Sequence, residues 1–178
     1  PDVDLGSDQS DFTPGGSALF VVSSDGKSVR EAVAGDIAQT TKLVAELSHL
    51  ALHTSSLVPS DVPPEVADCY RVFLMLRHGV KPIVSGAFGT DGIPNIHALL
   101  AAAVGGEAEL RARPRAVMVV CPLGPLRWTV ESCDNIVDCA RLGLPLSFGS
   151  IPIPGVSAPA TLAGSVVVHT VETLSGLV

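Results

Sequence analysis

Short apolar runs alternate along this chain with longer segments in which apolar residues recur every three or four positions. The clearest run is Ala116–Val120, a continuous apolar stretch typical of a strand buried in a parallel sheet. Similar runs predict strands at 18–22, 50–58, 82–87 and 145–150, of which the second is the weakest. The strand centres are spaced by 31, 32, 35 and 29 residues, taking them as Val21, Leu52, Val84, Val119 and Phe148.

The segments between these runs have the periodicity of amphipathic helices. Asp36 and Thr129 are predicted helix caps, and Gly79 and Gly143 are predicted helix ends. A turn at 24–27 follows the first strand. We expect helices at 36–49, 65–78, 95–104, 107–113, 129–142 and from 160 or 161 to the C-terminus.

A regular strand–helix beat is what consecutive βα units produce, with a parallel sheet covered by helices. A doubly wound sheet and a (β/α)₈ barrel both fit it. The chain has no GxGxxG or GxxxxGK[ST] motif, which weakens the nucleotide-binding sheet. A complete barrel takes roughly 250 residues. We therefore predict a single α/β domain over residues 1–178, an incomplete (β/α)₈ (TIM) barrel segment, with Val3–Leu5 as one further strand.

Composition limits the function classes. Eleven basic and 18 acidic residues give a net charge of −7, which argues against general nucleic-acid binding and against an anionic membrane surface. Hydrophobic residues make up 47% of the chain and charged residues 16%, which excludes disorder. The most apolar stretch, Ser165–Val178, is too short and too polar for a membrane span. The N-terminus has no signal-peptide pattern, and four cysteines without a CxxC indicate reduced thiols and a cytoplasmic setting.

Several residue types do not form a recognisable site. The five histidines form no HxH, HxxxH or HExxH pattern, so we expect no metal. Cys121 is interpreted as a buried, inert thiol. The charges of the 65–78 helix are interpreted as a solvated face, namely Glu65, Asp68, Arg71 and Arg77.

In a barrel, chemistry sits in the loops that follow the strands. Here those loops are 88–91, 121–127 and 149–161, and the last is the most unusual because it packs prolines and glycines around hydroxyls before a helix start. One interpretation is a rigid connection with Ser157 or Thr161 as the helix cap. The other is a ligand-binding loop, since glycine lets the backbone approach a ligand and a helix start offers free amides.

The segment 155–164, with Glu172 and 175–178 after it, resembles the glycine/threonine/proline loop and following helix of the trimethylamine methyltransferase family. That family includes corrinoid-dependent methyltransferases for trimethylamine, glycine betaine and related amines. The similarity runs over nearly the whole chain. Other stretches agree in order, namely 13–18, 59–63, 81–82, 105–107, 125–126 and 143–145.

The resemblance implies a (β/α)₈ barrel methyltransferase that moves a methyl group from a methylamine to the cobalt of a separate corrinoid (cobalamin) protein, as in methanogenesis. It also implies that the chain is an internal piece, lacking an N-terminal segment and the closing barrel units. The family's pyrrolysine would lie in that missing part, so the catalytic residues remain unknown. Gly124, Ser157 and Val171 depart from the family's common residues and leave the substrate open.

A quaternary amine has no N–H to donate, so aromatic faces and a carboxylate hold it best. Phe88, Phe148 and Trp128 lie near strand ends, where they serve either as ligand faces or as ordinary packing. Glu172 is either a structural pair or subunit contact, or a ligand-facing acid. The expected substrate-binding residues are Phe88, Phe148, Ser150, Gly155, Ser157, Pro159, Thr161 and Glu172.

We expect no tightly bound cofactor, because the corrinoid belongs to the partner. The other expected partners are a small methylated amine and either a second copy of the chain or a barrel-completing chain, with neither nucleic acid nor membrane. Two alternatives stay open. One is a non-corrinoid barrel enzyme that binds a small anion at the helix start after Gly155, and the other is a non-catalytic structural or assembly fragment.

Overall fold

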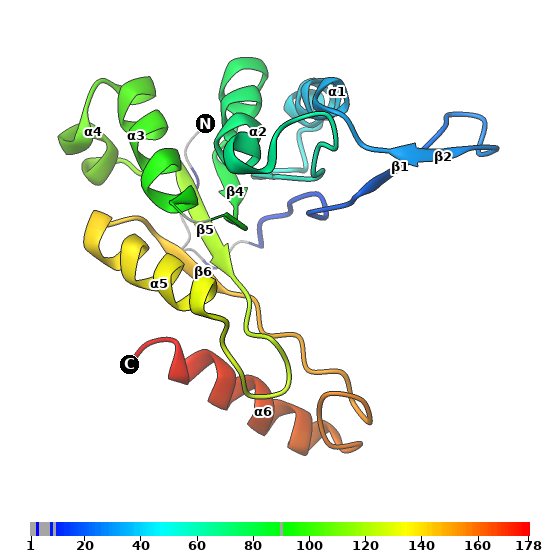
Figure 1. The fold of residues 1–178 in the computed structure, drawn as a ribbon, viewed down its shortest axis with the longest axis vertical. Helices are drawn as coiled ribbons and strands as arrows, with labels where there is room; N and C mark the ends of the chain where they lie inside the picture. Colours follow the sequence, from blue (N-terminus) through cyan, green and yellow to red (C-terminus); the bar gives the residue numbers. More distant parts are fainter. Residues whose placement is uncertain (1–2, 4–7, 9, 90) are drawn as a thin grey trace.

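The computed structural model describes residues 3, 8, 10–89 and 91–178, and its centre is a parallel four-stranded sheet. The strand order is β3-β4-β5-β6, in which every strand pairs with its neighbour in sequence (Figure 1). This arrangement confirms parallel βα units. Within the described residues the sheet does not close into a barrel. The strands are β3 (His53–Thr54), β4 (Ile83–Ser85), β5 (Ala116–Val120) and β6 (Leu146–Phe148).

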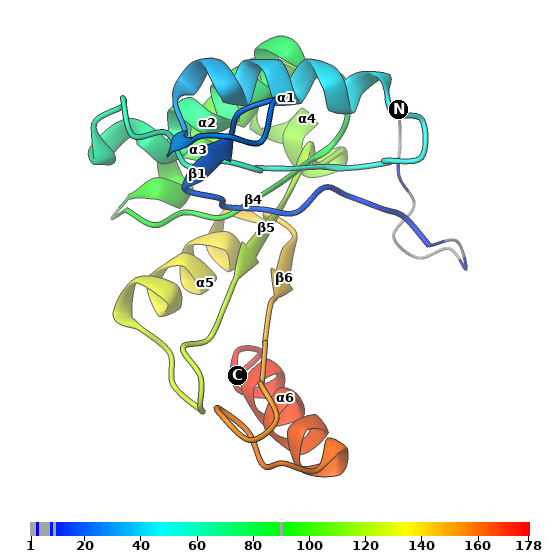
Figure 2. The same cartoon turned by 90° about the vertical axis from the view of Figure 1, so that its right-hand side faces the viewer.

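Six helices in the described residues follow the predicted ranges to within three residues at most boundaries. Helix α1 packs on α2, and α2 packs on α3, on the same side of the sheet (Figure 2). Helix α6 lies at the opposite end of the molecule from α1 and α4 (Figures 1 and 2). The helices are α1 (Ala34–Glu46), α2 (Pro64–His78), α3 (Gly92–Val104), α4 (Glu107–Ala112), α5 (Val130–Leu142) and α6 (Leu162–Ser175).

The helix ends show which capping predictions were right. The Thr129 hydroxyl accepts from the Ser132 amide at 3.1 Å, which confirms this cap, and α5 ends at Gly143, where φ is +72°. The Asp36 prediction was wrong by position. Asp36 is the third residue of α1, and its carboxylate reaches back to the Val33 amide at 2.9 Å, so the helix begins before it.

The core lies between the sheet and the helices α1, α2, α3 and α5. Along β5, fully buried positions alternate with half-buried ones, and Met118 is completely buried. One face of the sheet is therefore packed against helices, whereas the other is partly open within the described residues. The core side chains include Ile37, Val72, Met75, Ile83, Ile93, Ile96, Leu100, Met118 and Cys139.

The strand predicted at 18–22 does not join the parallel sheet, so the expectation that Val21 lies in a strand adjacent to those of Val84, Val119 and Phe148 was wrong. Strand β1 (Phe20–Val22) pairs antiparallel with β2 (Val29–Glu31) in a projecting hairpin (Figure 1). The predicted turn explains this result, because Gly26 has a φ of +70° and the chain folds straight back.

A different segment lies beside β3 where a preceding parallel strand was expected. Residues 12–18 run parallel to the chain around β3, with isolated bridges from Phe12 to Leu50 and from Ala18 to Leu57. The further strand predicted at 3–5 falls mostly outside the described residues.

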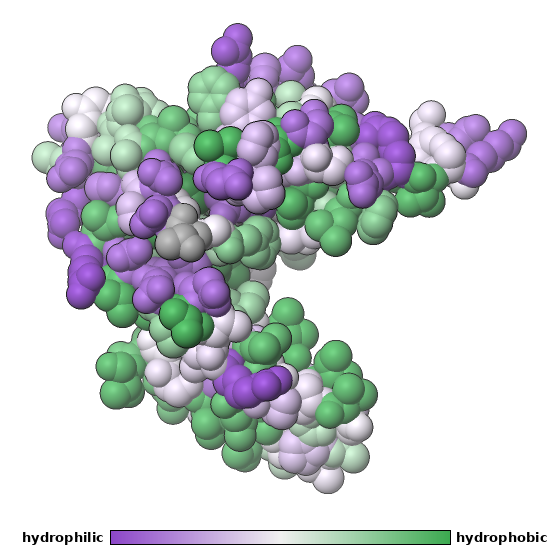
Figure 3. Space-filling view, in the orientation of Figure 1, coloured by the Kyte–Doolittle hydropathy of each residue, from purple (hydrophilic) through white to green (hydrophobic). Residues whose placement is uncertain are grey.

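The surface around α6 is largely apolar, and Figure 3 shows the molecule hollowed between this end and the part that carries the hairpin. Val166 and Val167 are 63% and 62% exposed. Throughout the part of the chain that the structure describes, no helix has both the length and the apolarity needed to cross a bilayer.

Candidate functional site at the strand ends

The carboxyl ends of the four parallel strands lie at one edge of the sheet, and two polar clusters gather there. The Asp68 cluster is built on α2 and on the loops after β3 and β4. The Glu172 cluster is built on α6 and on the loops after β5 and β6. The Asp68 cluster comprises Ser55, Asp68, Arg71, Gly86, Phe88 and Gly89, and the Glu172 cluster comprises Leu126, Trp128, Phe148, Ser150 and Glu172.

Glu172 joins three elements. Its side chain is buried on α6, with only 2% of the residue exposed. One carboxylate oxygen accepts from the Leu126 amide at 2.9 Å, in the loop after β5. The other accepts from the Ser150 hydroxyl, just after β6. This carboxylate therefore holds two strand-end loops against α6.

Two aromatic rings lie at the end of the helix that carries Glu172. Trp128 and Phe148 meet edge to face, with ring centroids 5.8 Å apart. The Trp128 indole N–H donates to the Ser175 hydroxyl at 3.0 Å, which fixes the indole to the end of α6. A Cβ at Gly176 would lie 2.5 Å from the Phe148 ring, so the chain passes directly over that ring.

The loop between β6 and α6 is held by its own hydrogen bonds. The Ser157 hydroxyl accepts from the Ile153 amide at 2.9 Å, and the Gly155 amide donates to the Ala158 carbonyl at 2.8 Å. Gly155 has a φ of +78°, and a Cβ there would meet nothing within 4 Å. Glycine is therefore favoured at 155 by backbone conformation, with no close approach of another group.

Thr161, not Ser157, caps α6. Its hydroxyl accepts from the Gly164 amide at 3.1 Å. Pro159 closes the loop onto the helix start, because the Ser165 hydroxyl donates to its carbonyl at 3.2 Å. Of the two caps that the sequence offered, Thr161 is the one that forms.

The loops after β5 and β6 approach one another at Gly124. A Cβ at Gly124 would lie 3.5 Å from the Ser157 Cβ and 3.9 Å from a Glu172 carboxylate oxygen. Ser157 therefore lies beside the Glu172 cluster, although its hydroxyl is engaged within its own loop.

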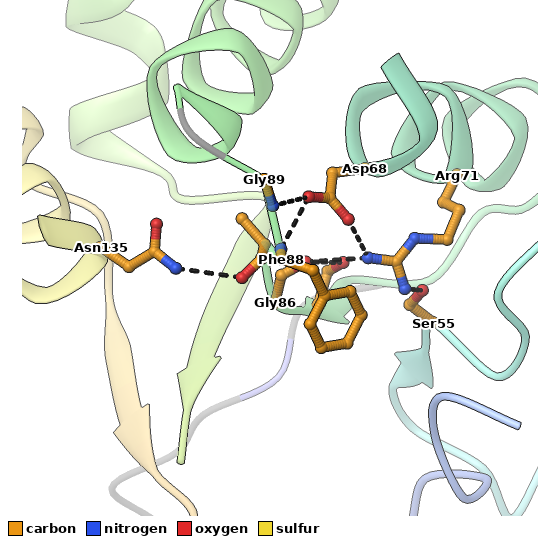
Figure 4. A network of polar contacts seen from close by, with 9 residues as sticks. Ser55, Asp68, Arg71, Gly86, Phe88, Gly89 and Asn135 are labelled. Atoms are coloured by element: carbon orange, nitrogen blue, oxygen red, sulfur yellow. Dashed lines mark hydrogen bonds and ion pairs between the residues drawn. The ribbon is translucent and has the colours of Figure 1, made fainter. Parts of the chain in front are cut away.

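Arg71 is the centre of the other cluster and is 99% buried, with 1% of the residue exposed (Figure 4). One terminal nitrogen donates to the Asp68 carboxylate at 2.6 Å and to the Gly86 carbonyl at 3.0 Å. The other donates to the Ser55 hydroxyl at 2.9 Å. The guanidinium thus links α2 to the residues that follow β3 and β4.

Asp68 holds the loop after β4. Its second carboxylate oxygen accepts from the Phe88 amide at 2.7 Å and from the Gly89 amide at 2.9 Å. The Arg71 guanidinium lies over the Phe88 ring, with its carbon 5.1 Å from the ring centroid. Phe88 is nevertheless 62% exposed, so its ring covers the cation and also faces solvent.

The trimethylamine methyltransferase family model matches the chain over residues 1–178. The chain belongs to the trimethylamine methyltransferase family. It is 27% identical over 177 residues to trimethylamine methyltransferase MttB of Desulfitobacterium hafniense (strain DSM 10664 / DCB-2), covering 99% of this chain and 36% of that protein. It is 43% identical over 74 residues to the protein of the same name from Methanosarcina thermophila, covering 42% of this chain and 15% of the relative.

A second activity occurs among the family's relatives. The chain is 24% identical over 174 residues to glycine betaine methyltransferase of Desulfitobacterium hafniense (strain Y51), covering 97% of this chain and 36% of that protein. The chain thus spans about a third of the length of the curated relatives that it matches along its whole length.

The structure brings half of the expected substrate-binding residues of this family member to one place. Phe148, Ser150 and Glu172 belong to the Glu172 cluster, with Ser157 beside it. Phe88 lies apart from them, in the Asp68 cluster. The remaining three residues shape the loop or cap that leads into α6, namely Gly155, Pro159 and Thr161.

The interpretation of Asp68 and Arg71 as a solvated face was wrong. Both side chains are buried, whereas Glu65 and Arg77 on the same helix are exposed as expected. Helical spacing could have found the pair, because positions 68 and 71 share a face with the apolar positions 72 and 75.

Carboxylates also line a small hollow beside the loop after β4. Its volume is about 170 Å³, and Gly89, Asn135 and Arg141 line it together with four acidic residues. The described residues contain no group of three or more histidine, cysteine or acidic side chains that could hold a metal ion. The carboxylates of the hollow are Asp91, Glu131, Asp134 and Asp138.

Desolvation shifts the pKa values of two side chains, one in the sheet and one just after β5. It lowers the pKa of His53, on β3, to about 4, and the nearby Lys81 charge acts in the same direction. Partial desolvation of the sulfur raises the pKa of the Cys121 thiol, so this cysteine is not an activated nucleophile. The expectation that Cys121 is buried was wrong for the residue as a whole, which is exposed, although its sulfur lies close to Gly149.

Proposed function

We propose that this protein transfers a methyl group from a tertiary or quaternary methylamine to the Co(I) of a corrinoid protein. Its family membership over residues 1–178 supports this proposal. The observation that carries it is that the Trp128–Phe148 ring pair lies against the end of α6, the helix that also carries the buried carboxylate of Glu172.

These groups fit a cation that cannot donate a hydrogen bond. Aromatic faces attract an ammonium group through their quadrupoles, with about 0.5–2 kcal/mol per contact. The structure records no ion pair to Glu172 among the described residues, so its charge is available to act on a nearby cation. The four carboxylates of the 170 Å³ hollow add a negative field that attracts a cationic substrate toward this edge.

For a quaternary substrate such a transfer asks the protein for positioning rather than for acid or base chemistry, and a tertiary amine would react as its protonated ammonium ion. The corrinoid, carried by the partner protein, would supply the Co(I) nucleophile for the methyl carbon, and the C–N bonding pair would stay with the departing neutral amine. This chain would bind the ammonium group, orient one methyl toward the open edge of the strands and exclude water.

Methyl transfer to a reduced corrinoid protein tests this function. The loss of the Co(I) absorbance on addition of trimethylamine or glycine betaine measures the reaction. We expect transfer with the protein and none without it. No turnover with any methylated amine would contradict the proposal.

A glycine substitution tests the loop between β6 and α6. Gly155→Val should abolish transfer while leaving the fold intact, because a branched residue is strained at a φ of +78° although no atom blocks its Cβ. Gly26→Val is the matched control, with the same open surroundings and a φ of +70° in the remote hairpin. Wild-type turnover in Gly155→Val would exclude this loop from the site.

The anion-binding alternative is less favoured by the geometry. At the start of α6, the Gly164 amide already donates to the Thr161 hydroxyl, so this donor is not free for an anion. A rise in the melting temperature on addition of inorganic phosphate, and none on addition of methylamines, would support that alternative.

A further inference from the structure

The Asp68–Arg71 pair is poorly explained as a device for stability alone. Replacing a buried ion pair by apolar side chains is often neutral or stabilising. This pair is also imperfect, because the Arg71 Nε is buried without a hydrogen-bond partner. A buried donor without a partner is destabilising, because it loses its bond to water and gains none in the protein. What the pair does supply is a fixed geometry at the ends of β3 and β4.

We propose that Asp68 and Arg71 are positioning residues that hold the Phe88 ring at the strand ends and balance the charge beneath it, so that the outer ring face can receive a methylammonium group. The inference deepens the proposed function and rests on it. It adds a third aromatic ring, from the Asp68 cluster, to the two of the Glu172 cluster.

The hydrogen bonds account for the placement of the ring. One Asp68 oxygen accepts from two successive amides, those of Phe88 and Gly89, at 2.7 and 2.9 Å. Arg71 fixes the backbone two residues before Phe88, because it donates to the Gly86 carbonyl at 3.0 Å. Ala87, the residue between Gly86 and Phe88, is held by Asn135, which donates to its carbonyl at 3.0 Å. The backbone around Phe88 is therefore held from α2 and from α5 (Figure 4).

The charges account for the role of Asp68 toward a cation. The Arg71 guanidinium already occupies one side of the ring, 5.1 Å from its centroid. Without a counter-ion this charge would repel a second cation on the other side. The Asp68 carboxylate lies 2.6 Å from the guanidinium and compensates for it. The exposed side of the ring can then attract an ammonium group.

Two probes of similar shape separate the charge effect from loss of structure. Tetramethylammonium is cationic, and 3,3-dimethylbutan-1-ol carries a neutral trimethyl-substituted carbon. In Asp68→Asn, we expect the dissociation constant of tetramethylammonium to rise on the order of tenfold. That of the alcohol should change less than about twofold, since asparagine retains the shape and its single acceptor oxygen can keep the bonds from the Phe88 and Gly89 amides, although the bond from Arg71 is lost.

A second substitution should rescue the cation. Asp68→Asn combined with Arg71→Met removes both charges but also the Arg71 bond to the Gly86 carbonyl. Both dissociation constants should therefore rise, but the ratio of the tetramethylammonium constant to that of the alcohol should return to within about threefold of its wild-type value. Glu65→Gln is the control, because Glu65 is an exposed carboxylate on the same helix, one turn earlier. It should leave both dissociation constants unchanged.

The outcomes distinguish this inference from the proposed function. Failure of the wild-type protein to bind tetramethylammonium would contradict the proposed function and this inference together. Wild-type binding with equal losses for the cation and the alcohol in Asp68→Asn, or with no rescue by Arg71→Met, would overturn the inference alone. If Asp68→Asn fails to fold, Phe88→Leu replaces it and should weaken tetramethylammonium severalfold more than the alcohol. Equal effects of Phe88→Leu on the two probes would overturn the inference.

Discussion

Helices α2 and α6 use the same device with different support. Each carries a buried carboxylate, Asp68 or Glu172, that accepts a backbone amide from a strand-end loop. Asp68 is paired with the buried Arg71, within the packed region formed by α1–α4 and β3–β5. Glu172 forms no ion pair with the described residues. It lies on a helix whose apolar side chains are mostly exposed. We call such a carboxylate, which holds a strand-end loop to a helix, a tether. A tether can therefore be part of the core, as Asp68 is, or lie outside it, as Glu172 does.

The comparison implies that breaking the two tethers has different consequences. In the packed region, a lost partner leaves a charge that water cannot reach. In the projecting region, formed by the loops after β5 and β6 with α6, water can replace the lost bonds. The cost of each change should therefore follow burial of the partner rather than the number of hydrogen bonds.

The largest effect is expected for Asp68→Ala. The substitution leaves the Arg71 guanidinium buried without its counter-ion and releases the Phe88 and Gly89 amides. The free energy of unfolding should fall by about 3–5 kcal/mol. Chemical denaturation measures it, with Glu65→Gln as the control that should remain within about 0.5 kcal/mol of wild type. A loss below 1 kcal/mol would contradict the view that the Asp68 carboxylate on α2 is part of the packed core.

The next effect is a pH dependence confined to the packed region. His53 has a folded pKa of about 4, because burial disfavours its charged form, and an ordinary unfolded value of about 6.5. The unfolded chain therefore binds more protons between these values, and stability falls as the pH drops from about 6.5 to 4. His53 should contribute roughly 2–3 kcal/mol to this loss. Denaturation of wild type and His53→Asn across this range measures the contribution, and parallel curves would refute it.

The smallest effect is expected for Glu172→Ala. The change releases the Leu126 amide and the Ser150 hydroxyl, both of which lie in loops that solvent can reach. The free energy of unfolding should fall by about 1–2 kcal/mol. Trp128, the single tryptophan of the chain, should report the loosening through its fluorescence, since it is bonded to the end of α6. A loss as large as that of Asp68→Ala would remove the distinction between the regions.

The repeating strand–helix pattern predicted the parallel sheet with its alternating helices, because parallel strands buried by helices need continuous apolar runs. Strand β5 and helices α2 and α5 lie where periodicity placed them. Strand β1 shows the limit of this signal. An apolar run of three to five residues fits a buried strand or a hairpin equally well, and the turn at Gly26, not the apolarity, decides the outcome.

The candidate site was predictable in part. The strand-end loop 149–161 includes Ser150 and the family resemblance includes Glu172, and the structure joins the two through a hydrogen bond. The Asp68–Arg71 pair was missed because charged residues are usually exposed, although helical spacing places both on the face of the apolar positions 72 and 75. Their contacts were not predictable, because Gly86 and Phe88 follow another strand and no local pattern connects them with α2.

Amide hydrogen exchange at Phe88, Gly89 and Leu126 tests most directly the claim that each buried carboxylate holds its own loop. The Met118 amide, which donates to the Pro145 carbonyl at 2.8 Å in the sheet, reports global unfolding and serves as the reference. In Asp68→Ala, Phe88 and Gly89 should lose protection relative to Met118 while Leu126 keeps it. In Glu172→Ala, Leu126 alone should lose protection. Equal loss at all three amides in either variant, or no loss at the amides bonded to the substituted carboxylate, would contradict the account.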